Sequence, residues 1–356
     1  MIITIRPEAS SEERAHLMTL LCRVTESRAP IASTRTAERE VIALDGALID
    51  TQVQQLLLQQ PAVAEVLPLK TPYQLVSRSF QTTNTRILIG ADHTCDTVTV
   101  GEASASPVIM AGPCAVESRE QLLKTAHAVK AAGANVLRGG AFKPRTSPYQ
   151  FQGLGVEGLK LLAEAREQTG LPVVTEVMET EMVDMVAEYA DVFQIGARNV
   201  QNYALLRAVG KHPSKHPVLL KRGLSSTVEE WLLAAEYIMA AGNPNVILCE
   251  RGIRSYDPKT RNVLDLTCVP LLQEMTHLPV VVDPSHATGR RELVPTMARA
   301  SIAAGAQGLI IETHCDPSVA LCDGRQSIEP ETLTRIIREA KALAHLLHEN
   351  ELVQVA

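Results

Sequence analysis

The sequence predicts an α/β protein in which a (β/α)8 barrel follows a small ferredoxin-like α+β domain and a β-hairpin. From residue 107 onward, short apolar runs alternate with helical patterns through eight cycles, the order that a closed parallel barrel requires. Residues 1–70 instead follow the order strand, helix, strand, strand, helix, strand. Aromatic residues make up only 3% of the chain, so the core must be aliphatic, which suits helices packed around parallel strands.

The first domain, residues 1–70, contains six expected elements. A helix over residues 11–24 places Leu17, Leu20 and Leu21 on one face, the spacing of a helix that packs against a sheet. No residue of this segment belongs to a catalytic pattern, and small domains of this kind commonly regulate or oligomerise enzymes. The other expected elements are strands over 2–5, 31–36, 40–44 and 63–69 and a helix over 50–59.

Residues 71–106 are expected to join this domain to the barrel. The composition of residues 71–85 is that of a linker. Two short apolar runs, 86–90 and 97–101, flank the turn-rich residues 91–94 and predict a β-hairpin.

Residues 107–356 carry the strand–helix alternation of the predicted barrel. Helical patterns over 118–132, 156–168 and 227–241 follow expected strands. A doubly wound open sheet is the alternative fold, but it usually has a glycine fingerprint after its first strand, where Gly-Pro-Cys stands at 112–114. The expected strands are 108–110, 135–137, 173–177, 192–195, 218–220, 246–248, 280–282 and 309–311, and the last helix covers 331–350.

The composition is that of an ordinary globular protein of 356 residues, 46% of them apolar, with a net charge of −6. No apolar run is long enough to span a membrane, and the N-terminal apolar stretch is too short for a signal peptide. Seven scattered cysteines do not form a disulfide framework and fit a reducing cytoplasm. The acidic balance does not indicate nucleic-acid binding. We therefore expect a cytoplasmic protein that binds neither nucleic acid nor a membrane.

Ionisable side chains follow almost every expected barrel strand. The carboxyl ends of the strands of a (β/α)8 barrel share one rim, and that rim carries the active site. Chance placement of charge would not follow this register so closely, so we expect these side chains to converge. They include Cys114 and Glu117, the segment 138–147, Glu176, Arg198, Lys221, Glu250 with Arg251, Asp283 with His286, and Glu312 followed by Asp323.

The segment 138–147, Arg-Gly-Gly-Ala-Phe-Lys-Pro-Arg-Thr-Ser, is the most informative of these. Three cations, two adjacent glycines and two hydroxyls present positive charge and free backbone N–H groups to a phosphate or carboxylate. For this segment alone, a solvated basic turn is the alternative. Converging rim cations would repel one another without bound anions, so together they predict substrates with two phosphates and a carboxylate. These cations are Arg138, Lys143, Arg145, Arg198, Lys221 and Arg251.

A second set of rim residues could enclose a divalent transition metal. Cys114 follows the first barrel strand, His286 the seventh, and Glu312 and Asp323 the eighth, and these strands are neighbours in a closed barrel. A thiolate, an imidazole and two carboxylates suit Mn²⁺, Fe²⁺, Co²⁺ or Zn²⁺. Each residue alone could equally be structural, and only their joint position at one rim favours ligation. The nearby alternatives are Cys315 and Cys322 as ligands and His314 as a supporting residue.

These residues lie in motifs that closely resemble the 3-deoxy-D-arabino-heptulosonate 7-phosphate (DAHP) synthases, in the type I beta form with an N-terminal ferredoxin-like domain. The resemblance covers essentially the whole chain. The Lys-Pro-Arg-Thr block at 143–146 is closer to this family than to the related 3-deoxy-octulosonate 8-phosphate synthases. The motifs are GPCAVES, LRGGAFKPRTSPYQFQG, QIGARNVQN, LLKRG, NVILCERG, VVDPSHATGRRELV and DGRQS.

The resemblance implies a transferase that condenses phosphoenolpyruvate with erythrose 4-phosphate and water, giving DAHP and inorganic phosphate. This reaction opens the shikimate pathway to chorismate and the aromatic amino acids. The resemblance also implies a divalent metal (Mn, Fe, Co or Zn), a homotetramer or homodimer, and a possible aromatic amino acid effector at residues 1–70.

The same resemblance implies a role for each site residue. Cys114, His286, Glu312 and Asp323 are the implied metal ligands. The implied phosphoenolpyruvate contacts are Arg138, Lys143, Glu176 through water, the backbone of Ala197, Arg198, Lys221 and Arg251. The implied contacts to erythrose 4-phosphate are Pro144, Arg145, Thr146 and the region of Asp323. Beyond the resemblance, our own hypothesis for the catalytic set is Lys143 as the candidate proton donor, Glu176 as a candidate for water activation, and His286.

Three other functions remain open at this point. An octulosonate synthase would take arabinose 5-phosphate in place of the four-carbon sugar. A non-catalytic sensor could bind phosphoenolpyruvate or an aromatic effector, although an intact set of four ligands argues against it. A fused chorismate mutase has little support, because the helix over 331–350 is too short to form such a domain.

Overall fold

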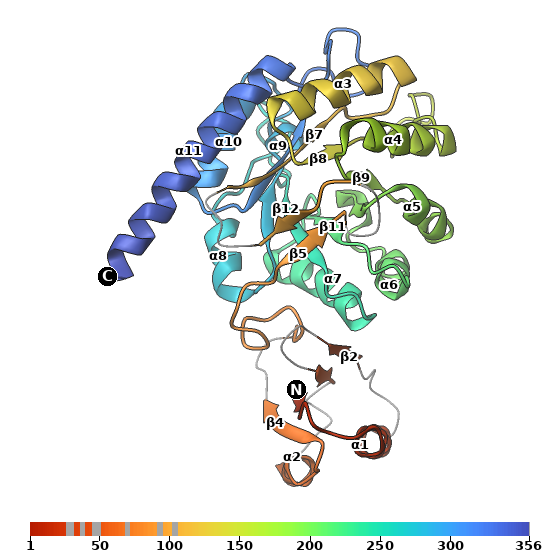
Figure 1. The fold of residues 1–356 in the computed structure, drawn as a ribbon, viewed down its shortest axis with the longest axis vertical. Helices are drawn as coiled ribbons and strands as arrows, with labels where there is room; N and C mark the ends of the chain where they lie inside the picture. Colours follow the sequence, from red (N-terminus) through yellow and green to blue (C-terminus); the bar gives the residue numbers. More distant parts are fainter. Residues whose placement is uncertain are drawn as a thin grey trace.

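The computed structural model describes residues 1–25, 32–35, 40–44, 51–67, 72–90, 95–101 and 106–355. Eight parallel strands close into a barrel in the order β10-β11-β12-β13-β14-β7-β8-β9, which confirms the expected fold class. Helices surround this barrel, and the N-terminal sheet lies beside the ring of helices, on the side of α7 (Val228–Ala240) and α8 (Cys268–Met275) (Figure 1). The barrel strands are β7 Val108–Gly112, β8 Val136–Arg138, β9 Val173–Glu176, β10 Val192–Ile195, β11 Val218–Lys221, β12 Val246–Glu250, β13 Val280–Val282 and β14 Gly308–Glu312.

Capping residues define several of the barrel helices. Ser118 accepts a hydrogen bond from the backbone N–H of Gln121 at the start of α3, and Gly133 ends that helix in a left-handed conformation. Thr227 and Glu230 form a capping box at the start of α7. The helices are α3 Arg119–Ala132, α4 Val156–Thr169, α5 Val183–Tyr189, α6 Tyr203–Lys211, α7 Val228–Ala240, α8 Cys268–Met275, α9 Pro284–Thr288, α10 Val294–Ala303 and α11 Pro330–Val355.

The expected element boundaries differ from the structure mainly at the carboxyl ends of the strands. β12 reaches Glu250 and β14 reaches Glu312, both beyond the last apolar residue of the expected strands. Both carboxylates are buried and paired with arginine, so a charged residue can extend a strand here. The last helix is also longer than expected, since it continues to Val355.

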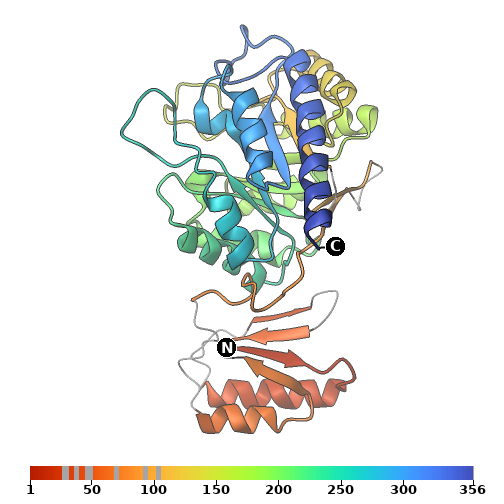
Figure 2. The ribbon, with the colours of Figure 1, turned by 90° about the vertical axis from the view of Figure 1, so that its left-hand side faces the viewer.

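The N-terminal segment forms an antiparallel sheet in the order β2-β3-β1-β4, with the expected chain order of strands and helices. Both helices cover the face of the sheet that points away from the barrel (Figure 2). Leu17, Leu21 and Leu57 are fully buried between them and the sheet. The elements are β1 Ile2–Ile5, α1 Ser11–Val24, β2 Ala32–Arg35, β3 Glu40–Ala43, α2 Thr51–Leu58 and β4 Val63–Leu67; the ends of the expected elements at 31, 36, 50, 68 and 69 lie outside the described residues.

The segment that follows this sheet is hydrogen-bonded to the barrel. The Glu236 carboxylate on α7 accepts from the backbone N–H groups of Leu75 and Val76 at 2.9 and 3.0 Å. His277 Nε2 lies 2.7 Å from the carbonyl oxygen of Leu75. Residues expected to be a linker therefore hold an ordered path along the outside of α7.

The expected hairpin, β5 Ile87–Ile89 and β6 Val98–Val100, contributes to the core inside the barrel. Ile87, Ile89 and Val100 are fully buried and belong to the cluster of inward-facing strand residues. The hairpin thus closes the end of the barrel opposite the carboxyl rim with apolar side chains. Its expected turn at 91–94 lies outside the described residues.

Within the described part of the chain, no helix combines the length and apolar character that a membrane crossing needs.

We predict that Ile87→Ala lowers the free energy of unfolding by about 2–5 kcal/mol, because it opens a cavity in the barrel core. The matched control is Leu88→Ala on the same strand, where the side chain is 51% exposed, and it should change stability by less than about 0.5 kcal/mol. Urea unfolding followed by circular dichroism measures both. Equal losses in the two variants would contradict this account of the hairpin.

Candidate active site

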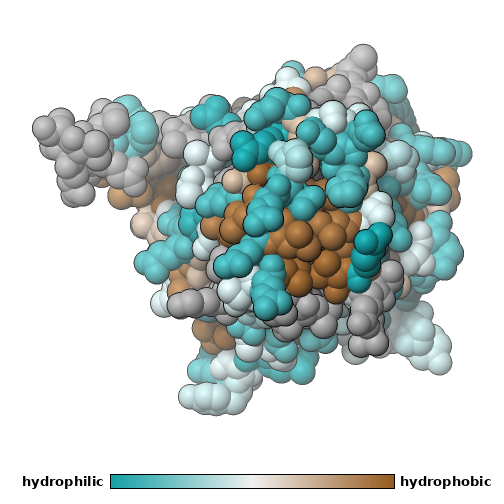
Figure 3. Space-filling model, turned by 90° about the horizontal axis from the view of Figure 1, so that it is seen from below, coloured by the Kyte–Doolittle hydropathy of each residue, from teal (hydrophilic) through white to brown (hydrophobic). Residues whose placement is uncertain are grey.

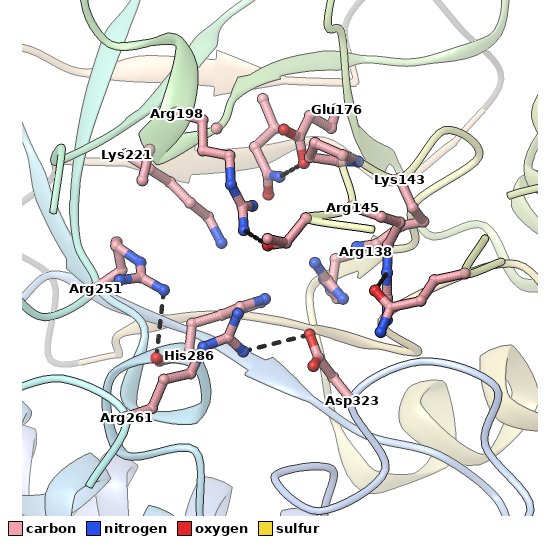
Figure 4. Close-up of a pocket in the computed structure, with 16 residues that line it drawn as sticks. Arg138, Lys143, Arg145, Glu176, Arg198, Lys221, Arg251, Arg261, His286 and Asp323 are labelled. Atoms are coloured by element: carbon pink, nitrogen blue, oxygen red, sulfur yellow. Dashed lines mark hydrogen bonds and ion pairs between the residues drawn. The ribbon is translucent and has the colours of Figure 1, made fainter. Parts of the chain in front are cut away.

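The carboxyl ends of the barrel strands surround an open-mouthed cavity of about 150 Å³ (Figure 4). Its wall contains every sequence-predicted site residue except Cys114 and Glu312, which lie in the adjoining cluster of possible metal ligands. The lining residues are Arg138, Lys143, Pro144, Arg145, Thr146, Gln150, Glu176, Gln194, Gly196, Ala197, Arg198, Lys221, Arg251, Arg261, His286 and Asp323.

Cations from separate strand ends point into this one space (Figure 4). Arg138, Lys221 and Arg251 are each at most 5% exposed. The Nε of Arg138 is buried and has no hydrogen-bond partner among the described residues. Arg138 pairs with Glu312 and Lys221 with Asp283, but cations outnumber carboxylates among the lining residues, so the cavity suits phosphate and carboxylate ligands.

Two adjacent glycines allow the loop after β8 to approach the loop after β7. The Gly140 N–H donates to the carbonyl of Cys114 at 3.1 Å, and Lys143 Nζ donates to the same carbonyl at 3.1 Å. A Cβ at residue 140 would lie 2.5 Å from the Lys143 side chain and 2.9 Å from that carbonyl oxygen. Glycine at 140 therefore lets Lys143 fold back beside Cys114.

Glu176, at the end of β9, is held in the cavity wall by two neighbours. Gln194 Nε2 donates to its Oε2 at 3.2 Å. A Cβ at Gly196 would come within 2.1 Å of Oε1, so only glycine leaves room for the carboxylate. This carboxylate is 6% exposed and faces a largely cationic surface.

Four side chains that end or follow the neighbouring strands β7, β13 and β14 form a compact cluster. The ligand atoms of Cys114, His286, Glu312 and Asp323 all lie within 4.8 Å of one another. The Cys114 Sγ lies 3.4 Å from Asp323 Oδ2, and the His286 Nε2 lies 3.1 Å from Glu312 Oε1. One sulfur, one imidazole nitrogen and two carboxylates make a donor set that fits a divalent transition metal.

The alternative ligands named from the sequence lie outside this group of four. Cys322 Sγ contacts Cys114 Sγ at 3.3 Å and Arg145, but it is not one of the four converging residues. His314 Nε2 lies 3.6 Å from Glu117 instead. Cys315 is half-buried and does not join the group either.

Asp283, which sequence reasoning left without a role, links the metal cluster to the cations. Its Oδ2 accepts from Lys221 Nζ at 2.7 Å and lies 2.7 Å from His286 Nδ1. Burial opposes its charge, but His286 and Lys221 outweigh burial and hold the pKa of Asp283 well below its usual value. Because the Asp283 carboxylate stays ionised and contacts Nδ1 of His286, the Nε2 of His286 is free to act as a ligand.

Without a metal, the cluster retains protons. Burial, with a contribution from Cys114, raises the pKa of Glu312 to about 7, although His286 and Arg138 oppose the shift. A hydrogen bond to Cys322, together with burial, raises the pKa of the Cys114 thiol well above its usual value. Metal binding must therefore displace protons from both groups.

Four residues of this region were not predicted from the sequence, and Asp283 was expected at the rim without a role. Gln150, Gln194 and Arg261 line the cavity, while Asp283 and Gln326 contact cluster residues. Gln194 lies near the end of β10, which could have indicated it, whereas Gln150, Arg261 and Gln326 lie on loops whose path no local pattern defines.

A (β/α)8 barrel with a cationic cavity beside a transition-metal donor set defines a class: enzymes that act on phosphorylated, carboxylate-bearing small molecules. The family model described as the DAHP synthetase I family matches residues 80–349. The chain belongs to this family, and the expected DAHP synthase function, condensation of phosphoenolpyruvate with erythrose 4-phosphate in the shikimate pathway, is confirmed.

Two matches from Thermotoga maritima agree with this assignment, and a third relative has the name of a related enzyme. The phospho-2-dehydro-3-deoxyheptonate aldolase of Thermotoga maritima is 45% identical over 356 residues, which cover 98% of each chain. The crystal structure of the Thermotoga maritima DAHP synthase matches with a TM-score of 0.74 at 44% identity and 98% coverage of both chains. The 2-dehydro-3-deoxyphosphooctonate aldolase of Nitratidesulfovibrio vulgaris strain DP4 is 36% identical over 264 residues, 69% of this chain and 94% of that protein.

We predict that the affinity of the metal-free protein for Co²⁺ rises with pH. The raised pKa of Glu312 means that it binds a proton below pH about 7, and Cys114 stays protonated through neutral pH. Each displaced proton adds one to the slope of log affinity against pH, so the slope should be roughly 2 below pH 7 and roughly 1 above it.

Titration of the metal-free protein with Co²⁺ across this pH range measures the slope. Glu312→Gln serves as the control, since it should remove the steeper part of the curve below neutral pH while the contribution of Cys114 remains. An affinity independent of pH would contradict the protonation states given above.

Proposed function

We propose that the rim cavity binds phosphoenolpyruvate among its buried cations and erythrose 4-phosphate nearer its mouth, next to the four-residue metal cluster. One observation carries this assignment: cations from separate strands meet in a single cavity that also contains His286 and Asp323 of the cluster. Two anionic substrates and a metal account for both features at once.

The deep part of the cavity is assigned to phosphoenolpyruvate. Arg138, Lys143, Lys221 and Arg251 are all buried there, and Arg198 and the backbone of Ala197 complete the wall. The free Nε of Arg138 supports this assignment, because a phosphate or carboxylate oxygen would satisfy it. Guanidinium groups bind both of these anions in a bidentate manner and so fix the substrate's orientation.

The outer part is assigned to erythrose 4-phosphate. Pro144, Arg145 and Thr146 lie in the loop after β8 and line the cavity together with Asp323. Thr146 Oγ1 accepts a long hydrogen bond from Arg198 at 3.5 Å. The loop thus sets the sugar phosphate beside the phosphoenolpyruvate subsite, so the two reacting carbons can meet.

The cluster is assigned to a divalent cation, with Mn, Fe, Co and Zn as the candidates that its donors suit. When bound, such an ion supplies a Lewis acid for the aldehyde of erythrose 4-phosphate. The phosphoenolpyruvate C3 attacks that aldehyde carbon, water adds at C2, and the C2–O bond to the phosphate breaks. The products are DAHP and inorganic phosphate, so atoms and charge balance.

Two residues are assigned to proton movement. Lys143 is buried between the two subsites. Burial and Arg138 lower its pKa, but negative charge on Cys114, Cys322 and Glu176 outweighs them and raises the pKa above its usual value. Lys143 therefore stays protonated and can deliver a proton to the new hydroxyl. Glu176 faces the same space and is assigned to the water that adds at C2.

Residues 1–70 are assigned as a separate regulatory and oligomerising domain, residues 71–106 as the linker and hairpin, and residues 107–356 as the catalytic barrel. An apolar patch on the lower face, over α1 and α2, supports assembly into a homodimer or homotetramer (Figure 3). Leu56 and Leu58 on α2 are 41% and 52% exposed. An aromatic amino acid is the proposed effector of this domain, and the cytoplasm, which suits seven free thiols, is the proposed location.

We predict that Lys143→Met lowers kcat by about 10²–10⁴-fold, because the proton donor is lost. Steady-state release of inorganic phosphate from the two substrates measures the loss. The control is Lys130→Met, which removes an exposed lysine of α3 that pairs with Asp96, and it should retain full activity. Turnover of Lys143→Met within about threefold of the wild type would exclude this role.

We also predict that the enzyme prefers erythrose 4-phosphate to arabinose 5-phosphate. Phosphate release should require erythrose 4-phosphate, and arabinose 5-phosphate should support turnover at least about tenfold less well, since an extra carbon displaces one end of the substrate from its subsite. Parallel assays with the two sugar phosphates at equal concentration decide between them. Faster turnover with the five-carbon sugar would instead assign the octulosonate reaction.

A further inference from the structure

Gln326 is a buried amide that contacts the metal cluster without belonging to it. Its side chain is 2% exposed, and its Nε2 donates to Glu312 Oε2 at 2.6 Å. The other carboxylate oxygen, Oε1, faces His286 Nε2 and Arg138 Nη1, each at 3.1 Å. The two oxygens of Glu312 therefore have different surroundings. Gln326 is hydrogen-bonded to the oxygen that points away from the imidazole.

The amide of Gln326 has a fixed orientation because its oxygen is also used. Arg261 Nη1 donates to Gln326 Oε1 at 3.0 Å. An arginine can only donate and a carboxylate can only accept, so the amide must present its oxygen to Arg261 and its nitrogen to Glu312. Arg261 thereby sets which atom of Gln326 meets the carboxylate.

The same short turn also carries Asp323, the fourth member of the cluster. Asp323 adopts a left-handed conformation with φ +53°, an unfavourable geometry for a residue with a side chain. Its carbonyl accepts from the Gln326 N–H and from Ser327 Oγ, both at 3.2 Å, and its Oδ2 lies 3.5 Å from Arg261 Nη1. Backbone and side-chain contacts within 323–327 therefore hold this aspartate in place.

We propose that Gln326, oriented by Arg261, is a positioning residue that fixes the Glu312 carboxylate and joins it to Asp323. The turn from Asp323 to Gln326 links two acidic ligands that come from different parts of the chain, one at the end of β14 and one on the following loop. Their preorganisation raises the affinity of the cluster for a divalent cation. This inference rests on the metal site assigned under the proposed function.

The experiment compares Co²⁺ binding by metal-free wild type and variants, using competition with a chromophoric chelator and the sulfur-to-cobalt absorption of Cys114. Gln326→Met keeps the length of the side chain and removes the amide. Removal of an outer partner typically weakens metal binding about 10–100-fold, so we expect a loss in this range for Gln326→Met. Arg261→Met should give a smaller loss, nearer the lower end, and Arg261→Lys should restore part of it.

The matched control is Gln194→Met. Gln194 is also a buried glutamine of the cavity that donates to a glutamate, but its partner is Glu176, which is not in the cluster. It should leave the Co²⁺ affinity unchanged, whereas a general effect of removing a buried amide would weaken binding in both glutamine variants. Circular dichroism and the thermal midpoint of the metal-free proteins report whether each variant folds.

The outcomes separate the two claims. Wild-type affinity in folded Gln326→Met, or equal losses in both glutamine variants, overturns the positioning role while the metal site stands. A wild-type protein that binds Co²⁺ without the sulfur absorption overturns the metal site and this inference with it. If Gln326→Met does not fold, Arg261→Met decides alone: weaker Co²⁺ binding supports the role, and unchanged binding overturns it.

Discussion

Closure of the barrel by the pairing of β14 with β7 is the constraint on which the site depends. The register from Gly308↔Val108 to Glu312↔Gly112 sets the end of the last strand beside the end of the first. Cys114 follows directly after β7, so a residue nearly two hundred positions away from Glu312 joins the same cluster. An open sheet with the same strands would leave these two ends at opposite edges.

Ion pairs allow charged side chains to be buried at this rim. Arg138 pairs with Glu312, Lys221 with Asp283, and Arg222 with Glu250, all with both partners buried. Each pair takes a cation and an anion out of water together, which is tolerable where an isolated charge would not be. Lys143 and Arg251 donate instead to backbone carbonyls, which do not neutralise their charge, so substrate anions can do so.

The two ends of the barrel differ in composition: the amino end is apolar and the carboxyl end is polar. At the amino end the hairpin β5–β6 fills the interior with Ile87, Ile89 and Val100, and the strand residues above it are aliphatic. At the carboxyl end, polar loops replace that packing and support one another through side-chain contacts such as Arg261 with Gln326. A rigid apolar base can thus hold strand ends at fixed separations while loops supply the chemistry.

The sequence by itself determined the strand and helix order, the barrel and the rim residues, because periodicity and the position of charge after a strand are local properties. The motif resemblance then assigned roles to most of those residues. Only the tertiary structure decided that Glu312 meets both Arg138 and Gln326, that Asp283 joins Lys221 to His286, and that Arg261 reaches the cluster. These contacts join positions up to 174 residues apart, and their partners depend on how strands close and loops pack, which no local pattern encodes.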